Sequence, residues 1–258
     1  MIFDAHFHYA PCVALSLPQV DCRNYAALSC AHSQKEFEAQ KYAPGNILKA
    51  YGLHPQAAAD FSPGDADFLE GLLQKNLISA VGEAGFDYFS AEFKAYADAQ
   101  EEMWRIQLDF SAFFDVPLVV HCRKANHRLF EYASALRKCP AVLFHSFMGT
   151  CAEAGSFLSR GIHGFFSFGK QIMNNNKKAV DCVRNLPVDC LLLETDAPFQ
   201  FLRGQAVTYP REILDIYRAA HALRARESFD DFCLALERNA RSFLGIPIPA
   251  ASGNDILS

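Results

Sequence analysis

Short segments that are apolar at almost every position recur along this chain, and longer amphipathic stretches separate many of them. A short run of this kind is typical of a parallel strand whose two faces are both buried. Eight segments have this character: Ile2–His8, Tyr25–Cys30, Ile47–Leu53, Leu77–Glu83, Pro117–Cys122, Ala141–Ser146, Gly164–Phe168 and Cys190–Thr195. The sequence therefore predicts a parallel sheet of eight strands.

The stretches between the predicted strands have the periodicity of amphipathic helices. We expect helices at Asp65–Lys75, Ala91–Phe114, Ala125–Lys138, Cys151–Arg160, Pro210–Ala225 and Ser228–Leu244. Strands that alternate with helices form a parallel sheet, and eight of them favour closure into a barrel. The predicted fold class is α/β, as a single (β/α)8 TIM-type barrel that can be distorted and carries helices at its C-terminal end.

The length of 258 residues is close to the roughly 250 residues of one such barrel, although two small domains would also fit it. No internal repeat, low-complexity segment or change in composition marks a boundary within the chain. We therefore expect one domain over residues 1–246. Residues 247–258 contain Pro249 and Gly253 and have no periodicity, so they are expected to form a frayed tail.

The charge balance and the cysteines narrow the possible surroundings of the protein. The net charge is −5, so the surface has no basic excess for nonspecific binding along duplex nucleic acid. The nine cysteines form no Cys-x-x-Cys pair, which argues against zinc fingers and a disulfide framework and indicates a reducing compartment. The chain starts without a signal-like segment, and no apolar run reaches the roughly 18 residues of a membrane span. We expect a cytoplasmic protein with no membrane partner.

Histidines and carboxylates stand where five of the predicted strands end. They are His6 and His8, Glu83, His121, His145 and Asp196. The carboxyl ends of barrel strands form the active-site face, so these side chains should converge. Each one alone could be an ordinary strand-end, capping or structural residue. Burying them together is costly unless each is paired or binds a metal, so the set predicts a site for Zn²⁺, Mn²⁺ or Mg²⁺.

Six short motifs follow one another along almost the whole chain. They are Asp4-Ala5-His6-Phe7-His8, Tyr51-Gly52-Leu53-His54-Pro55, Val81-Gly82-Glu83-Ala84-Gly85-Phe86-Asp87-Tyr88, Pro117-Leu118-Val119-Val120-His121-Cys122-Arg123, Phe144-His145-Ser146-Phe147-Met148-Gly149 and Leu193-Glu194-Thr195-Asp196-Ala197-Pro198. Together with the closing segment Asn239-Ala240-Arg241-Ser242-Phe243-Leu244-Gly245, this ordered set resembles the TatD family of metal-dependent deoxyribonucleases. That family belongs to the amidohydrolase-like barrels.

The resemblance implies two divalent metal ions (Zn, Mg or Mn), with His6, His8 and Asp196 as ligands of one, His121 and His145 as ligands of the other, and Glu83 as a bridge. It also implies a hydrolase that cleaves phosphodiester bonds with an activated water. Metal binding can lower the pKa of water from 15.7 towards about 7. Asp196 is the best candidate to orient that water and accept its proton, so Asp196 and Glu83 are the predicted catalytic residues.

Basic residues follow several of the predicted strand ends. Arg123, Lys170 and Arg203 would rim the barrel mouth and contact a few phosphates, or else belong to an ordinary solvated surface. His54 would support a metal ligand, touch the substrate or make only a strand-end hydrogen bond. With the acidic net charge, this pattern favours DNA ends or short single strands over a long duplex, and a small phosphoester is a further possible substrate.

Two other functions are compatible with the same residues. Such a site activates water whatever the substrate, so the chain could be a metal-dependent hydrolase of an ester, an amide or a phosphotriester. It could also be a non-catalytic scaffold that the metals stabilise. The presence of both Glu83 and Asp196 argues against the scaffold.

Overall fold

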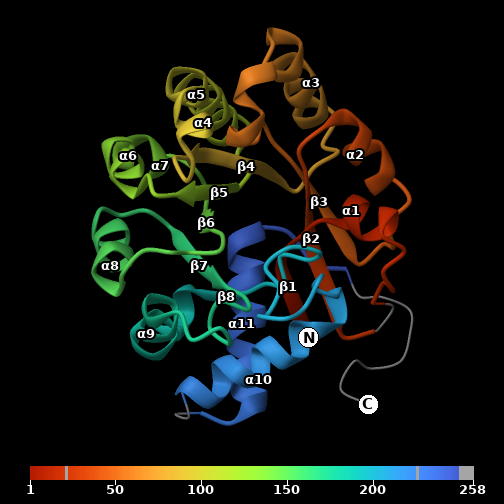
Figure 1. Cartoon of the computed structure of the whole chain (residues 1–258), viewed down its shortest axis with the longest axis vertical. Helices are drawn as coiled ribbons and strands as arrows, with labels where there is room; N and C mark the ends of the chain where they lie inside the picture. Colours follow the sequence, from red (N-terminus) through yellow and green to blue (C-terminus); the bar gives the residue numbers. More distant parts are fainter. Residues whose placement is uncertain (21–22, 225–226, 250–258) are drawn as a thin grey trace.

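Eight parallel strands form one sheet, in sequence order from β1 to β8. The computed structural model describes residues 1–20, 23–224 and 227–249. The strands are β1 (Ile2–Phe7), β2 (Tyr25–Ala31), β3 (Ile47–Tyr51), β4 (Ala80–Asp87), β5 (Leu118–Arg123), β6 (Val142–Phe144), β7 (Gly164–Phe168) and β8 (Leu191–Leu193). Figure 1 shows the strands around the centre of the molecule and helices on the outside. The predicted (β/α)8 fold is confirmed.

The helices are more numerous than the sequence predicts, and most of the predicted ones are shorter in the structure. They are α1 (Tyr9–Ala14), α2 (Gln34–Gln40), α3 (Pro63–Gln74), α4 (Ala91–Lys94), α5 (Ala97–Phe114), α6 (Asn126–Glu131), α7 (Ala133–Leu136), α8 (Cys151–Ser159), α9 (Lys177–Asn185), α10 (Ile213–Arg224) and α11 (Phe229–Leu244), with 3₁₀ helices η1 (Pro55–Asp60), η2 (Val188–Cys190) and η3 (Pro210–Glu212). The predicted helix 125–138 is interrupted at Tyr132, whose hydroxyl donates a hydrogen bond to Glu101 of α5. This hydrogen bond joins two separate helices, so the periodicity of the segment does not reveal it.

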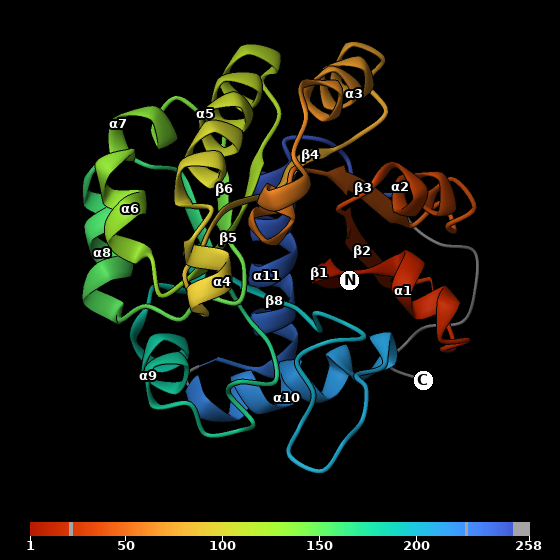
Figure 2. The same cartoon turned by 45° about the horizontal axis from the view of Figure 1, so that its top comes forward.

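Helix α11 covers the barrel interior at the amino ends of the strands. Phe243 and Leu244 of α11 belong to the same buried cluster as Phe3 of β1 and Phe165 of β7. Figures 1 and 2 show α11 behind the middle of the ring of strands. Ile248, which follows α11, is buried in this cluster too, whereas residues 250–258 of the predicted tail lie outside the described residues. The carboxyl ends of the strands are left for the site.

Hydrogen bonds beyond the end of β8 join it to β1. The backbone N–H of Asp196 donates to the carbonyl of His6 at 2.9 Å, and that of His8 donates to the carbonyl of Ala197 at 2.8 Å. Asp4, fully buried in β1, accepts the backbone N–H of Thr195 at 2.9 Å and its hydroxyl at 2.6 Å. Burial raises the pKa of Asp4 to about 7, although these two hydrogen bonds oppose the rise. The contacts hold Asp196 beside His6 and His8.

The fourth strand differs from the prediction, which ends it at Glu83. Strand β4 continues to Asp87 and pairs with β5 at Val81 and, after a shift in register, from Ala84 to Asp87. Glu83 therefore lies inside the strand, and the expectation that it closes the strand is wrong. A charged residue usually marks the end of a buried strand, but here imidazoles from other strands surround the carboxylate.

The eight cysteines in the described part of the chain are all free thiols. Within the same part, no helix has the length and apolar character needed to cross a membrane.

Candidate metal centre

Glu83 is the central residue of the site, and its side chain is almost completely buried. Both of its carboxylate oxygens face imidazole nitrogens. The distances from Oε1 are 2.5 Å to His32 Nε2, 3.4 Å to His6 Nε2 and 3.6 Å to His8 Nε2. The distances from Oε2 are 2.6 Å to His145 Nε2, 3.4 Å to His121 Nδ1 and 3.9 Å to His54 Nε2. One carboxylate thus connects two groups of histidines.

The first group lies where β1 and β8 meet. His6 and His8 are two residues apart, so strand geometry directs both side chains to the same face. Oδ1 of Asp196 is 3.3 Å from His8 Nε2 and 3.7 Å from His6 Nε2. The three side chains can offer ligand atoms that all lie within 4.8 Å of one another. They are therefore close enough to share one ion.

The second group comes from β5 and from the residue directly after β6. Nδ1 of His121 is 3.2 Å from Nε2 of His145. On its other side, Nε2 of His121 donates to Oδ2 of the buried Asp87 at 3.0 Å. Burial would lower the pKa of His121, but its hydrogen bonds to Asp87 and Glu83 outweigh burial and raise it to about 9. A carboxylate behind a histidine fixes the ring orientation, as it does for histidine ligands in metal sites.

The charges at the centre suit a divalent cation. Burial alone would raise the pKa of Glu83, but the surrounding imidazoles, above all His6, outweigh it and hold the pKa well below its usual range. Burial lowers the pKa of His6 to about 4, and burial with neighbouring imidazoles lowers that of His54 well below normal. His6 and His54 are therefore neutral beside an ionised carboxylate, and these are the protonation states that bind metal. A metal held by His121 would have to displace the proton that the two carboxylates stabilise on that ring. The residues therefore fit metals that take nitrogen and oxygen ligands, such as Zn²⁺ or Mn²⁺.

Sequence reasoning misses His32, which is among the nearest neighbours of Glu83. It follows β2 directly, and its ring packs against that of His54 with 4.3 Å between the ring centres. The predicted strand stops at Cys30, whereas β2 includes Ala31. The rule that polar residues gather at strand ends would have found His32 if the strand end had been placed one residue later.

Two buried carboxylates near the histidines are also absent from the predicted set. Asp87 supports His121 but lies beyond the predicted end of β4. Glu194 accepts the hydroxyl of Ser167 at 2.5 Å, and its Oε1 is 3.9 Å from Nδ1 of His145. Burial, together with the nearby carboxylates, raises the pKa of Glu194 well above its usual range. Both residues belong to motifs on which the family resemblance rests, and this membership is the sequence signal that could have identified them.

The residues predicted to contact substrate occupy different environments. Arg123 lines the mouth of the barrel, with its guanidinium 4.0 Å from the ring centre of Phe89 and 3.9 Å from Asp87. His54 lies in the centre, and its Nδ1 accepts the backbone N–H of Gln56 at 3.2 Å. This bond leaves Nε2 of His54 directed towards Glu83. Support of a metal ligand, contact with substrate and a strand-end hydrogen bond therefore all remain compatible with its position.

The expectation that Lys170 rims the mouth is wrong. Its side chain is 1% exposed, and Nζ donates to Gln205 at 2.7 Å, Thr208 at 3.0 Å and Glu212 at 2.8 Å. All three N–H bonds of the ammonium are therefore used within the protein. Arg203 is exposed, but it does not line either of the two cavities over the centre.

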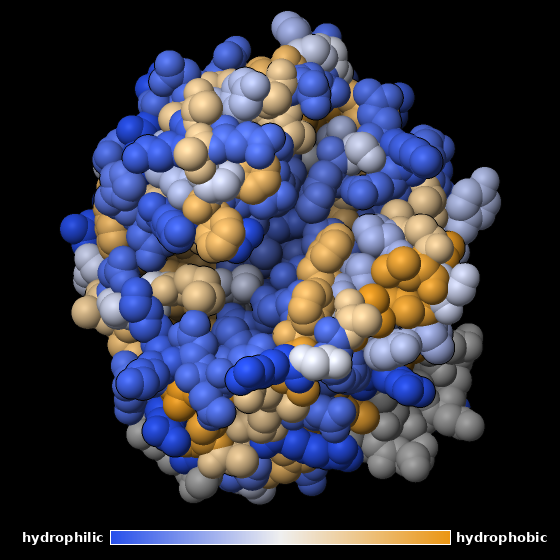
Figure 3. Space-filling model, viewed as in Figure 1, coloured by the Kyte–Doolittle hydropathy of each residue, from blue (hydrophilic) through white to orange (hydrophobic). Residues whose placement is uncertain are grey.

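Two cavities open over the centre and share part of their lining. One of about 340 Å³ reaches from His121 and His145 to Gln171, and the other, of about 330 Å³, covers Glu83 and His32. Figure 3 shows a hydrophilic hollow near the middle of this face, with a hydrophobic ridge beside it. The centre is therefore reached from the carboxyl ends of the strands.

Comparison with known proteins points to one family. A family model described as "TatD related DNase" matches residues 3–245. A Pantoea vagans protein named "3′-5′ ssDNA/RNA exonuclease TatD" is 32% identical over 174 residues, which cover 67% of this chain and 65% of the relative, slightly less than two thirds of its length. The crystal structure of YjjV, a TatD homologue from Escherichia coli, superposes with a TM-score of 0.83 at 24% identity, covering 95% of this chain and 98% of that one. A TatD-family hydrolase from Entamoeba histolytica gives a TM-score of 0.75 at 17% identity, with 94% and 97% covered.

Proposed function

Because this chain belongs to the TatD related DNase family, we propose that it is a divalent-metal-dependent nuclease that hydrolyses phosphodiester bonds. We further propose that its substrate is single-stranded DNA or RNA cut from a 3′ end, the activity for which the Pantoea relative is named. The free thiols of the described cysteines support a cytoplasmic location for this reaction.

The position of Glu83 carries the proposal. Its two carboxylate oxygens face separate groups of histidines, and both groups lie below the open barrel mouth. We assign one ion to His6, His8 and Asp196, a second to His121 and His145, and both to Glu83. When bound, such ions polarise a phosphoryl oxygen and lower the pKa of a water molecule.

Asp196 is the proposed proton acceptor. Burial would raise its pKa, but the hydrogen bond to His8 and the charges of His6 and His8 hold the pKa below its ordinary value. The carboxylate is therefore ionised near neutral pH. Its Oδ2 accepts a hydrogen bond from Nε2 of Gln200 at 3.3 Å, while its Oδ1 faces the imidazole of His8. Held in this way, Oδ2 can orient an attacking water and take its proton.

Arg123 is the proposed phosphate contact. Its guanidinium stacks on the ring of Phe89. The Arg123 side chain is 41% exposed and lines the mouth of both cavities. A planar guanidinium binds phosphate through two parallel hydrogen bonds. One such cation suits a short single strand better than a long duplex, whose binding needs many phosphate contacts.

The test combines hydrolysis with metal analysis. Single-stranded oligonucleotides labelled at the 3′ or 5′ end are incubated with enzyme loaded with Zn²⁺, Mn²⁺ or Mg²⁺, with and without chelator, beside duplex DNA and a carboxyl ester. We expect chelator-sensitive loss of 3′ nucleotides. Asp196→Asn should lower kcat by about 10²–10⁴-fold and keep most of its metal, since its amide oxygen remains a ligand. Glu83→Ala should lose both metal and activity.

Gln74→Met, at an exposed position of α3, is the matched control and should behave as the wild type. Activity on the carboxyl ester alone would replace the nuclease with another hydrolase. Metal binding that raises Tm without turnover on any substrate would favour the scaffold. Undiminished activity in both Asp196→Asn and Glu83→Ala would refute the assigned roles.

A further inference from the structure

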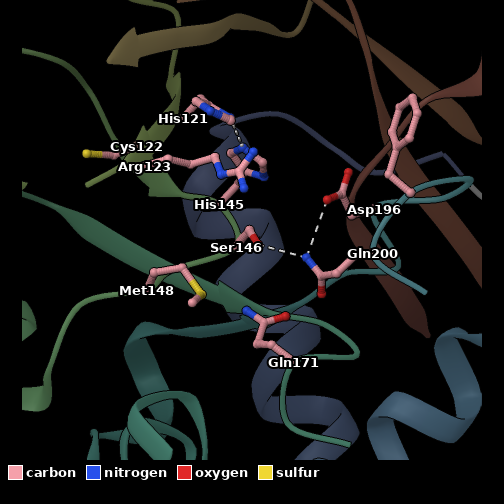
Figure 4. Close-up of a pocket in the computed structure, with 10 residues that line it drawn as sticks. His121, Cys122, Arg123, His145, Ser146, Met148, Gln171, Asp196 and Gln200 are labelled. Atoms are coloured by element: carbon pink, nitrogen blue, oxygen red, sulfur yellow. Dashed lines mark hydrogen bonds between the residues drawn. The ribbon is translucent and has the colours of Figure 1, made fainter. Parts of the chain in front are cut away.

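The cavity of about 340 Å³ beside the metal centre has two chemically different ends. In Figure 4, His121 and His145 lie on one side, and Met148 and Gln171 lie on the opposite side. Arg123 is the one permanently cationic side chain among the described residues that line it. The volume lies in the range of roughly 300–1,000 Å³ usual for small-molecule sites. The end remote from the histidines therefore offers neutral side chains to the part of the substrate that lies next to the reacting phosphate.

Gln171 carries an unused hydrogen-bond donor at this remote end. Its side chain is 7% exposed, and its Oε1 accepts the backbone N–H of Gly169 at 2.8 Å. A backbone N–H can only donate, so this bond fixes which way the amide is turned. Nε2 is then left buried with no acceptor in the described part of the chain. Figure 4 shows this nitrogen turned towards the side of Met148. An unpaired buried donor is stabilised by a ligand that brings an acceptor.

The neighbouring amide of Gln200 is occupied at its nitrogen but not at its oxygen, because Oε1 is buried with no hydrogen-bond partner in the described part of the chain. Its Nε2 donates to the hydroxyl of Ser146 at 2.7 Å and to Oδ2 of Asp196 at 3.3 Å. The apolar part of the lining comes from Met148 and Phe199, which are 42% and 48% exposed. The remote end thus combines the free amide donor of Gln171 and the unpaired amide oxygen of Gln200 with the solvent-exposed thioether of Met148. Phe199 lies on the side of the metal centre, where its ring packs against that of His8 with 5.0 Å between the ring centres.

We propose that this end of the cavity is a nucleoside subsite, in which Nε2 of Gln171 donates to an acceptor on the base of the nucleotide next to the cleaved phosphate. The proposal rests on the proposed nuclease function and specifies how the same site holds its substrate. The base packs against Met148, since a thioether makes favourable contacts with planar aromatic rings. Arg123 and the histidines hold the phosphate.

The subsite accepts several bases. Carbonyl oxygens and ring nitrogens on base edges are hydrogen-bond acceptors, such as O6 and N7 of guanine and O4 of thymine. Because Oε1 of Gln171 is held by Gly169, the amide cannot turn to accept from a base amino group. The unpaired Oε1 of Gln200 adds an acceptor for base amino groups. One donor and one acceptor therefore distinguish a nucleotide with a base from one without a base more strongly than they distinguish one base from another.

The experiment compares two oligonucleotides that differ only in whether the nucleotide beside the scissile bond carries thymine or is abasic. For the wild-type holoenzyme, we expect the abasic end to lower kcat/KM by about tenfold, as for loss of stacking and a hydrogen bond. Gln171→Met should lower kcat/KM on the thymine substrate by about five- to tenfold and on the abasic substrate by less than about twofold. Gln74→Met is again the matched control. Equal losses on both substrates would overturn the proposal.

A second variant separates the donor from the fold of the loop. Gln171→Glu keeps an acceptor for the N–H of Gly169 and removes the donor. A carboxylate accepts from the amino group of cytosine, so this variant should raise kcat/KM on cytosine ends relative to thymine ends, compared with the wild type. A Gln171→Glu variant with the same ratio of kcat/KM on cytosine and thymine ends as the wild type would show that the side chain of residue 171 does not contact the base.

A binding measurement distinguishes failure of the subsite from failure of the nuclease function. Calorimetry with the metal-loaded protein compares thymidine 5′-monophosphate with deoxyribose 5-phosphate. We expect tighter binding of the nucleotide to the wild type and a smaller difference for Gln171→Met. That result without any oligonucleotide hydrolysis would support the subsite and refute the nuclease. Efficient hydrolysis with identical affinity for both ligands would refute the subsite alone.

Discussion

Replacing Lys170 with Met tests whether its ammonium holds the structure together or binds phosphate. The change removes a charge that donates three hydrogen bonds, to Gln205, Thr208 and Glu212. Removing one partner of a buried ion pair costs about 3–5 kcal/mol. The side chain of Glu212 remains 16% exposed, and water can partly solvate it, so we expect the lower end, about 3 kcal/mol. At about 2–4 °C per kcal/mol for a chain of this size, Tm should fall by about 6–12 °C.

Calorimetry and urea unfolding measure this loss. A double-mutant cycle with Glu212→Gln should give a coupling of at least about 1 kcal/mol, since the double variant leaves no unpaired charge. Lys178→Met, at an exposed position of α9, is the control and should change stability by less than about 0.5 kcal/mol. If Lys170→Met kept wild-type stability but weakened the salt dependence of DNA binding, the lysine would contact phosphate and the structural reasoning would be refuted.

Three further changes have defined outcomes. Asp87→Asn should weaken metal affinity by about 10–100-fold in chelator competition, because the support of a histidine ligand is altered; unchanged affinity would exclude that support. In Gly169→Ala, the new Cβ would lie 2.3 Å from Oε1 of Gln200, so the free energy of unfolding should fall by about 1–3 kcal/mol. In Gly155→Ala, within α8, the new Cβ would have no atom within 4 Å, so the free energy of unfolding should rise by about 0.5–1 kcal/mol. Burial would raise the pKa of Glu212, but its lysine partner holds the pKa below the ordinary 4.5. This carboxylate therefore stabilises the fold above pH 4.5 and loses that effect as pH falls further, so the wild-type Tm should drop more steeply in acid than that of Glu212→Gln.

Local sequence pattern accounts for much of the barrel. Gly164–Phe168 is predicted with the observed bounds of β7, because a strand covered on both faces is apolar at nearly every position. Helix α1 is not predicted, since six residues are too few to establish a helical period. Its position depends on packing against the barrel, which no local pattern records.

The candidate site illustrates the same limit. His121 and His145 follow apolar runs, so the strand-end rule finds them and the structure brings them together. Asp87 escapes because the strand continues past a charged residue whose compensating partners come from other strands. Lys170 follows a strand end as a mouth residue would, but its partner Glu212 is 42 residues further along the chain. Burial of a charge is decided by such distant partners.

The bonds between Asp4 and Thr195 span 191 positions of the chain. During translation, His6 and His8 leave the ribosome first, and Asp196 follows only after most of the protein has been made. An early ion would meet two imidazoles without their carboxylate partner. The complete set of ligands therefore forms at a late step, when β8 reaches β1. A stalled or truncated chain that ends before Thr195 would carry all the proposed ligands except Asp196, so the proposed proton acceptor joins the site only once the barrel can close.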